Sequence, residues 1–210
     1  MDFSSMTKNQ KVCAVAEDVI AQVLCGAMVP ASSIYFLPQP DDSGCMVCAI
    51  GAAVLSEHVS ILNKDKTALS NDAVNGLRMD GTEIFTSDEL RGMEDVFEIT
   101  QMFGGKLRRI LGCNLPGGDN GADIRNVIHN GQKFKPKKED AAVLLTLYAL
   151  IIHNNGNIDN ALDDIRTGNP SFQNVMPIIR SVAEKYGQAI PEDSFVCDSL
   201  HFLKEKLSRC

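Results

Sequence analysis

Residues 141–152 read Ala-Ala-Val-Leu-Leu-Thr-Leu-Tyr-Ala-Leu-Ile-Ile and form the longest apolar run of the 210-residue chain. Thr146 interrupts the run, which at 12 residues is too short to cross a bilayer. A segment that is apolar almost all round predicts a helix that is buried on every side. We therefore expect residues 139–153 to form the central helix of the core, with the other helices packed around it.

Two other segments carry strong helix signals. Thr7-Lys-Asn-Gln10 fits a capping box, in which side chains satisfy the unpaired N–H groups of a first helical turn. Thr86-Ser-Asp-Glu89 repeats this pattern, and apolar residues follow both boxes at spacings of three and four. Shorter helical patterns cover 48–55, 106–113, 122–129, 157–166 and the segment that starts at Pro191. Together these patterns predict a mostly α fold, a compact multi-helix domain.

Residues 34–47 depart from the helical pattern. Ile34-Tyr-Phe-Leu37 is rich in β-prone residues, and Pro38 to Gly44 has the composition of a turn. We expect a minor β-hairpin or extended element near residues 34–47. Residues 56–80 are polar and include Asn75-Gly76, a pair typical of turns, so this stretch is expected to be loop-rich.

The length fits a single globular domain over residues 1–210. A loop-rich connector near 114–136 is a candidate sub-boundary, which would separate an N-terminal half from an all-helical C-terminal half. One continuous core is the alternative.

Composition argues against several functional classes. The chain is acidic, with a net charge of −7 and a pI near 5.1, which argues against a dedicated DNA-binding protein. It has no Trp and 6% aromatic residues, too few for aromatic platforms that stack single-stranded nucleic acid. Seven cysteines, an odd number, and an N-terminus without signal-peptide character predict free thiols in the cytoplasm, that of the host cell if the protein is phage-encoded. No membrane partner is expected.

Positive charge is concentrated in residues 104–138, here called the basic island. This segment holds eight basic and two acidic residues, a net charge of +6, whereas the rest of the chain carries −13. Such segregation favours an anionic partner or an acidic surface of another protein. The candidate partner- or phosphate-binding residues are Lys106, Arg108, Arg109, Arg125, Lys133 and Lys135. Among the interpretations of this segment, a solvated surface ranks first, a protein partner, which includes self-association, ranks second, and nucleic acid ranks third.

Cys45-Met-Val-Cys48 provides a second candidate site. A C-x-x-C between a β-prone run and a helix is the order that a thioredoxin-like thiol site requires. The remaining βαβ pattern is missing, and a zinc site would need two further ligands, for which Cys113 and His58 are candidates without a second closely spaced pair. Two thiols beside a turn are therefore the preferred interpretation, and no metal or cofactor is expected.

The segment that follows carries a resemblance. Gly44-Cys-Met-Val-Cys-Ala-Ile-Gly-Ala-Ala-Val-Leu55, preceded by the helix near Val15 to Gly26, resembles the G…C-A-[IV]-G-x-L core of short uncharacterised bacterial and phage proteins. The similarity covers residues 12–58, with Cys48 and Gly51 at matching positions and Val54-Leu55 where an apolar pair is usual. It implies a bacterial or phage accessory protein and no particular activity. Read from the residues alone, Cys48 and Gly51 need only be small where a helix packs closely.

Paired carboxylates occur on one predicted helix. Glu94, Asp95 and Glu98 are expected on its solvated face, because paired acids on an exposed helix are more often solvated than catalytic. The four histidines are far apart in sequence, and His201 is expected near a helix end. We therefore predict a non-enzymatic interaction or accessory protein that acts through a charge-polarised surface. The alternatives are nucleic-acid binding through residues 104–138 and a thiol- or metal-dependent enzyme that uses Cys45 and Cys48.

Overall fold

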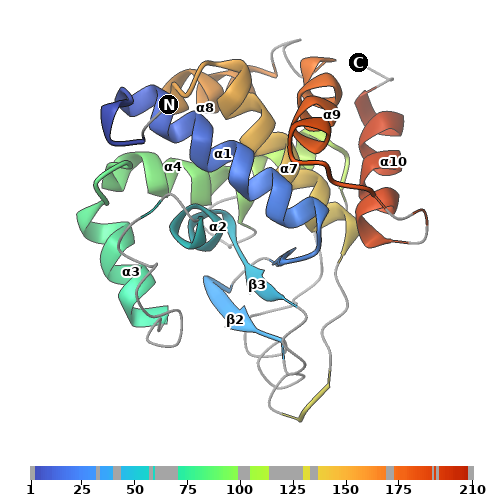
Figure 1. Ribbon diagram of the computed structural model, residues 1–210, viewed down its shortest axis with the longest axis horizontal. Helices are drawn as coiled ribbons and strands as arrows, with labels where there is room; N and C mark the ends of the chain where they lie inside the picture. The colour runs from blue at the N-terminus through green and yellow to red at the C-terminus, as the bar shows by residue number, and fades with distance from the viewer. Residues whose placement is uncertain are drawn as a thin grey trace.

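The computed structural model describes residues 3–31, 34–39, 44–56, 59, 71–98, 105–113, 130–132, 137–168, 173–190, 192 and 194–207. The elements in these ranges are η1 Phe3–Ser5, α1 Lys8–Leu24, β1 Met28–Pro30, β2 Phe36–Pro38, β3 Cys45–Val47, α2 Ala49–Leu55, α3 Asn71–Asp80, α4 Ser87–Phe97, α5 Lys106–Ile110, α7 Lys138–His153, α8 Ile158–Thr167, α9 Val175–Lys185 and α10 Phe195–Leu207. The predicted mostly α fold with a minor β element is confirmed (Figure 1).

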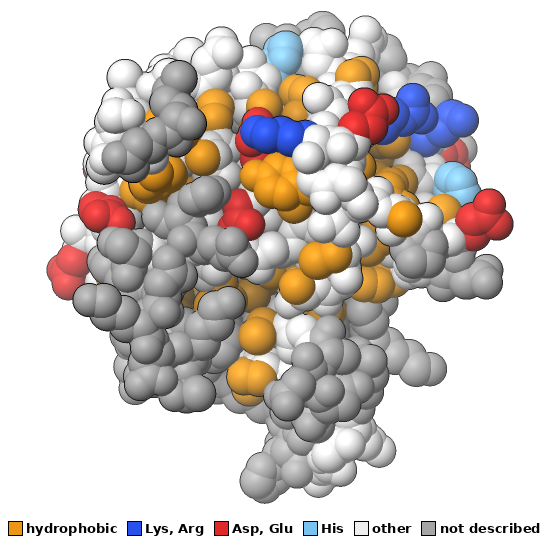
Figure 2. All heavy atoms as spheres, in the orientation of Figure 1, with side chains coloured by type: hydrophobic (Ala, Val, Ile, Leu, Met, Phe, Trp, Pro, Cys, Tyr) orange, Lys and Arg blue, Asp and Glu red, His pale blue; other side chains and the backbone are white. Residues whose placement is uncertain are grey.

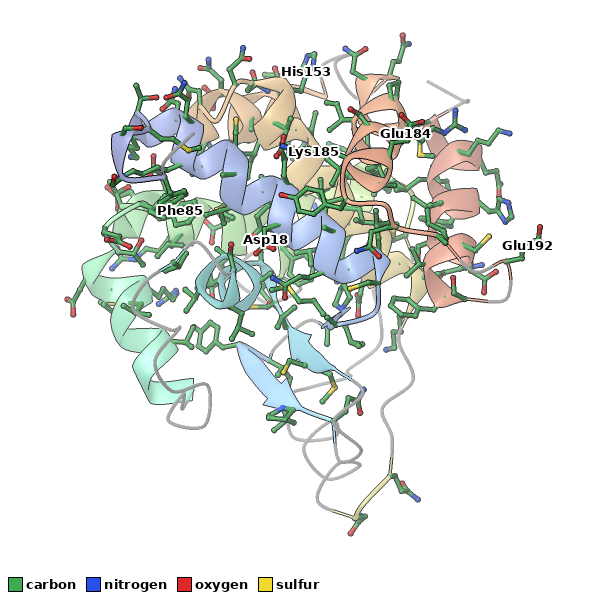
Figure 3. The ribbon with its side chains drawn as sticks, in the orientation of Figure 1. Asp18, Phe85, His153, Glu184, Lys185 and Glu192 are labelled. Carbon is green, nitrogen blue, oxygen red and sulfur yellow. The ribbon has the colours of Figure 1, made fainter. Side chains whose placement is uncertain are left out.

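Helix α7 lies at the centre, as the apolar run predicts. Every residue from Asp140 to Ile151 is buried, and α7 packs against α1, α8, α9 and α10. One cluster of buried apolar side chains extends from Val12 on α1 to Leu203 on α10. Lys185 on α9 forms an ion pair with Glu17 and so links α9 to the exposed side of α1 (Figure 3). No helix in the described ranges has both the length and the apolar character to cross a membrane.

Both capping boxes form as predicted. The Thr7 hydroxyl accepts from the Gln10 N–H, and the Gln10 side chain accepts from the Thr7 N–H. Thr86 and Glu89 make the same reciprocal pair at the start of α4. These two boxes fix the first residues of α1 and α4 by local hydrogen bonding, independently of the rest of the fold.

The β element is a three-stranded sheet in the order β1-β3-β2. Strands β2 and β3 are antiparallel, with Phe36 opposite Val47, and this pair is the predicted hairpin. Strand β1 was not predicted; it runs parallel to β3, with Met28 opposite Cys45, and closes the other edge. Its three residues are too few to show an alternating pattern.

Helix α3 corrects the expectation that residues 56–80 are loop-rich. Asn75 and Gly76 lie inside this helix and do not form a turn. Val74 is buried and Leu77 packs against the core, so tertiary contacts outweigh the local turn preference. Residues 57–58 and 60–70 of this stretch and the predicted helix at 122–129 lie outside the described residues.

A close approach explains Gly51 in α2. A Cβ atom at this position would lie 1.6 Å from the Tyr35 carbonyl oxygen, so only glycine fits. Cys48, immediately before the helix, is fully buried. These contacts agree with the interpretation that both positions are small because α2 packs tightly against its neighbours, here the segment between β1 and β2.

Candidate partner-binding groove

The structure divides the residues of the basic island. Lys106 and Arg109 are exposed on α5, whereas Arg108 between them is buried. The other three candidates, Arg125, Lys133 and Lys135, lie outside the described residues. The prediction that Arg108 contributes to a surface patch is therefore wrong.

Arg108 is held inside the protein by three interactions. Its guanidinium forms an ion pair with Asp140 in the first turn of α7. Its Nε donates to the Phe97 carbonyl oxygen over 3.0 Å, and the guanidinium lies 5.3 Å from the centre of the Phe97 ring. Burial raises the pKa of the Asp140 carboxyl, and the neighbouring Arg108 charge opposes that rise. Arg108 thus joins α5, α4 and α7 and has a structural role.

Helix α10 brings a further cation, Lys206, to the N-terminal end of α7. Lys138, the last residue of the basic island, lies with its Nζ 5.9 Å from the centre of the Phe202 ring. The Lys206 Nζ lies 5.1 Å from the same ring. The positive charge of Lys138, in the basic island, therefore lies beside the same aromatic ring as that of Lys206 on α10.

A groove of about 260 Å³ lies between α9 and α10. Eight side chains line it: the apolar Met176, Ile179, Ile190 and Leu200, the cationic Arg180 and Lys204, the thiol of Cys197 and the imidazole of His201. Two of these residues are cationic and none is acidic. Figure 2 shows Lys and Arg side chains gathered over α10, with a histidine beside them. The groove thus combines an apolar floor with a positively charged rim.

Carboxylates stand near this groove but not in its lining. Glu184 lies one turn beyond Arg180 on α9, and Glu192 lies on the segment before α10 (Figure 3). Both are exposed. Exposed carboxylates also occur on α10 at Asp198 and Glu205, so the absence of acidic residues is a property of the groove lining alone.

A cysteine and a histidine meet within the groove. The Cys197 Sγ lies 4.0 Å from the His201 Nδ1, because positions four apart on α10 share one face. The Cys197 N–H donates to the Ser194 Oγ over 3.2 Å, which fixes the backbone at the start of the helix. This separation is at the outer limit of a hydrogen bond that involves sulfur, so the thiol and the imidazole are neighbours on one face of α10.

The predicted thiol pair has a different environment. Cys48 is completely buried, and its pKa is raised well above the usual value, first by burial and then by the negative charge of Glu98. Cys45 is half-buried in β3. Because the thiolate is the reactive form, the environment of Cys48 disfavours a role as a nucleophile. Among the described residues, no three His, Cys, Asp or Glu side chains gather closely enough to hold a metal ion.

The carboxylates of α4 correct another expectation. Glu94 and Glu98 are buried and do not lie on a solvated face. The Tyr35 hydroxyl donates to the Glu94 Oε1 over 3.1 Å, and Arg78 pairs with the other carboxylate oxygen. Burial and the Glu94 charge raise the pKa of Tyr35 to about 12. This set joins α3 and α4 to the segment between β1 and β2.

Comparison of the chain with protein-family models, with curated proteins and with solved structures gives no match. The groove itself is therefore the basis for a functional argument. No sequence pattern pointed to Arg180, Cys197 or Lys204, and His201 was expected only near a helix end. The spacing Cys197-x-x-x-His201 was the one available signal, whereas Arg180 joins it only through the packing of α9 on α10.

Proposed function

We propose that this protein is a non-enzymatic interaction protein that binds an acidic, amphipathic segment of a partner protein in the groove between α9 and α10. The single observation that carries the proposal is the lining of that groove: an apolar floor with Arg180 and Lys204 and no acidic residue. A cytoplasmic location and a bacterial or phage origin belong to the same proposal, the latter because of the resemblance of residues 44–55.

Size and chemistry together favour a peptide segment. The groove is smaller than the pockets of about 300–1,000 Å³ that usually enclose drug-sized ligands. Such a volume suits one or two apolar side chains of a helix that lies along α9 and α10, which is a common mode of peptide recognition. Carboxylates of the partner would then meet Arg180 and Lys204 at the rim, where charge sets orientation and speeds encounter.

The basic island takes a smaller part in this proposal than the sequence suggests. Arg108 is buried, so Lys106 and Arg109 are the predicted contact residues that the structure describes as exposed. Nucleic-acid binding through the island remains a prediction, and the experiment below treats it as a separate outcome. The interior position of Cys48 argues against the alternative of a thiol-dependent enzyme at that residue.

Site-specific photocrosslinking tests the proposal. A photoreactive residue replaces Leu200 in the groove, and a control protein carries it at Met79, which is exposed on α3. We expect the Leu200 protein to capture in the source cell a segment rich in Asp, Glu and apolar residues, identified by mass spectrometry of the crosslinked peptide. The capture should disappear in the double variant R180E/K204E.

Three results would contradict the proposal. They are capture of the same segments from both positions, capture that is unaffected by the charge reversal, and crosslinks only to nucleic acid or to a second copy of the chain.

A further inference from the structure

We propose that Cys197 is a site of reversible thiol modification by small disulfides that carry carboxylates, such as oxidised glutathione. The evidence is the juxtaposition in one groove of an accessible thiol, the His201 imidazole and the two cations Arg180 and Lys204. The inference uses the groove of the proposed function but does not depend on a protein partner, because small disulfides test it directly.

The chemistry is a thiol–disulfide exchange. In the tautomer that carries its proton on Nε2, the His201 Nδ1 accepts the proton of the Cys197 thiol. The Cys197 sulfur attacks one sulfur of the small disulfide, the S–S bond of that disulfide breaks, and a new S–S bond to Cys197 forms. The second half of the disulfide leaves as a thiolate and takes up the proton from His201. The small disulfide is the oxidant, so the exchange is balanced without another reactant.

Charge gives this site its selectivity. Arg180 and Lys204 line the same groove as Cys197, and the lining holds no carboxylate. Positive charge around a recess raises the local concentration of anions and speeds their arrival. A disulfide with carboxylate substituents should therefore react faster than a neutral one, and a cationic one should react more slowly.

Other cysteines provide internal controls. Cys25 is exposed at the end of α1, where its Sγ lies 3.4 Å from the Gln22 carbonyl oxygen, and it is not part of the lining of the groove between α9 and α10. Cys48 is fully buried. Rates at Cys197 and Cys25 can be compared in one sample, since both belong to the same folded protein.

The test measures modification rates by peptide mass spectrometry with three probes: oxidised glutathione, neutral hydroxyethyl disulfide and cationic cystamine. We expect oxidised glutathione to modify Cys197 about tenfold faster than Cys25, since electrostatic focusing of this kind is worth ten-fold or more. The variant R180Q/K204Q should lose this advantage while its reaction with hydroxyethyl disulfide stays unchanged. His201→Gln should slow all three probes at Cys197 and leave Cys25 unaffected.

Two outcomes would overturn the inference. One is equal reactivity of Cys197 and Cys25 toward every probe. The other is a Cys197 rate that is indifferent both to the charge of the probe and to the loss of Arg180 and Lys204. All substituted side chains are exposed, so far-ultraviolet circular dichroism is expected to show that the variants fold as the wild type does. A failure of this inference would leave the proposed partner binding untouched, because photocrosslinking at Leu200 requires no free thiol.

Discussion

Replacement of Arg108 by methionine gives the sharpest test of the interior. The side chains of Arg108 and Asp140 are 1% and 4% exposed, so the substitution leaves a buried carboxylate without its counter-charge. Loss of one partner of a buried ion pair costs about 3–5 kcal/mol. The lost Nε hydrogen bond to the Phe97 carbonyl accounts for about 1 kcal/mol of this cost. A domain of ordinary stability has about 5–15 kcal/mol in total, so the variant should be severely weakened.

Urea unfolding followed by circular dichroism measures this loss. The double variant R108M/D140L should recover most of it, because replacing both charges by apolar groups is often neutral. Arg109→Met is the matched control on the same helix, and its exposed position predicts a change within about 0.5 kcal/mol. If Arg108→Met is as mild as Arg109→Met, the guanidinium is not buried and the account of α5 is wrong.

The same variant should show a pH dependence of defined sign. Burial already raises the pKa of Asp140, and loss of Arg108 removes the charge that opposes the rise. A carboxyl whose pKa is higher in the folded than in the unfolded protein favours folding at low pH, and that contribution is lost as the pH rises through the folded pKa. The loss of unfolding free energy in Arg108→Met should therefore become smaller as the pH falls from neutral toward the usual pKa of an aspartate, about 4. A deficit that stays constant or grows over this range would contradict the assignment.

Two further predictions concern packing and thiol burial. Gly51→Ala should destabilise the protein by about 1–3 kcal/mol, because the added Cβ meets the Tyr35 carbonyl. Gly76→Ala, in the open part of α3, should stabilise the protein by about 0.5–1 kcal/mol in the same urea assay. Equal effects of the two substitutions would refute the close approach of Gly51 to Tyr35. Cys48 should resist iodoacetamide until the protein unfolds, while Cys25 reacts in the native state, and rapid native labelling of Cys48 would show that α2 is not packed as described.

The parts of the fold that depend on local signals could be predicted from the sequence. The capping boxes at Thr7 and Thr86 are complete within four residues, and the apolar run of α7 leaves it no position other than the centre. The hairpin of β2 and β3 follows from its turn residues. Helix α3 and strand β1 were missed, because one is stabilised by packing against its local preference and the other is three residues long.

The candidate site depended on tertiary contacts that a linear pattern does not contain. Charge counting placed Arg108 with its basic neighbours, whereas its actual partner, Asp140, lies beyond a segment of about thirty residues and belongs to the most apolar helix of the chain. Arg180 and Lys204 stand on separate helices, 24 positions apart in the sequence, so no single run of basic residues contains both. Arg180 and Lys204 come together because α9 packs against α10, and this contact cannot be predicted from the spacing of residues in the sequence.

The central claim is that the groove of α9 and α10, and not the exposed remainder of the basic island, binds the acidic partner. The direct measurement is calorimetric titration of the captured acidic segment, as a synthetic peptide, into wild type, R180E/K204E and K106E/R109E. We predict that R180E/K204E weakens binding at least about tenfold, equivalent to 1.4 kcal/mol, while K106E/R109E binds as the wild type does. Loss of binding in K106E/R109E with normal binding in R180E/K204E would contradict the claim and return the site to the basic island.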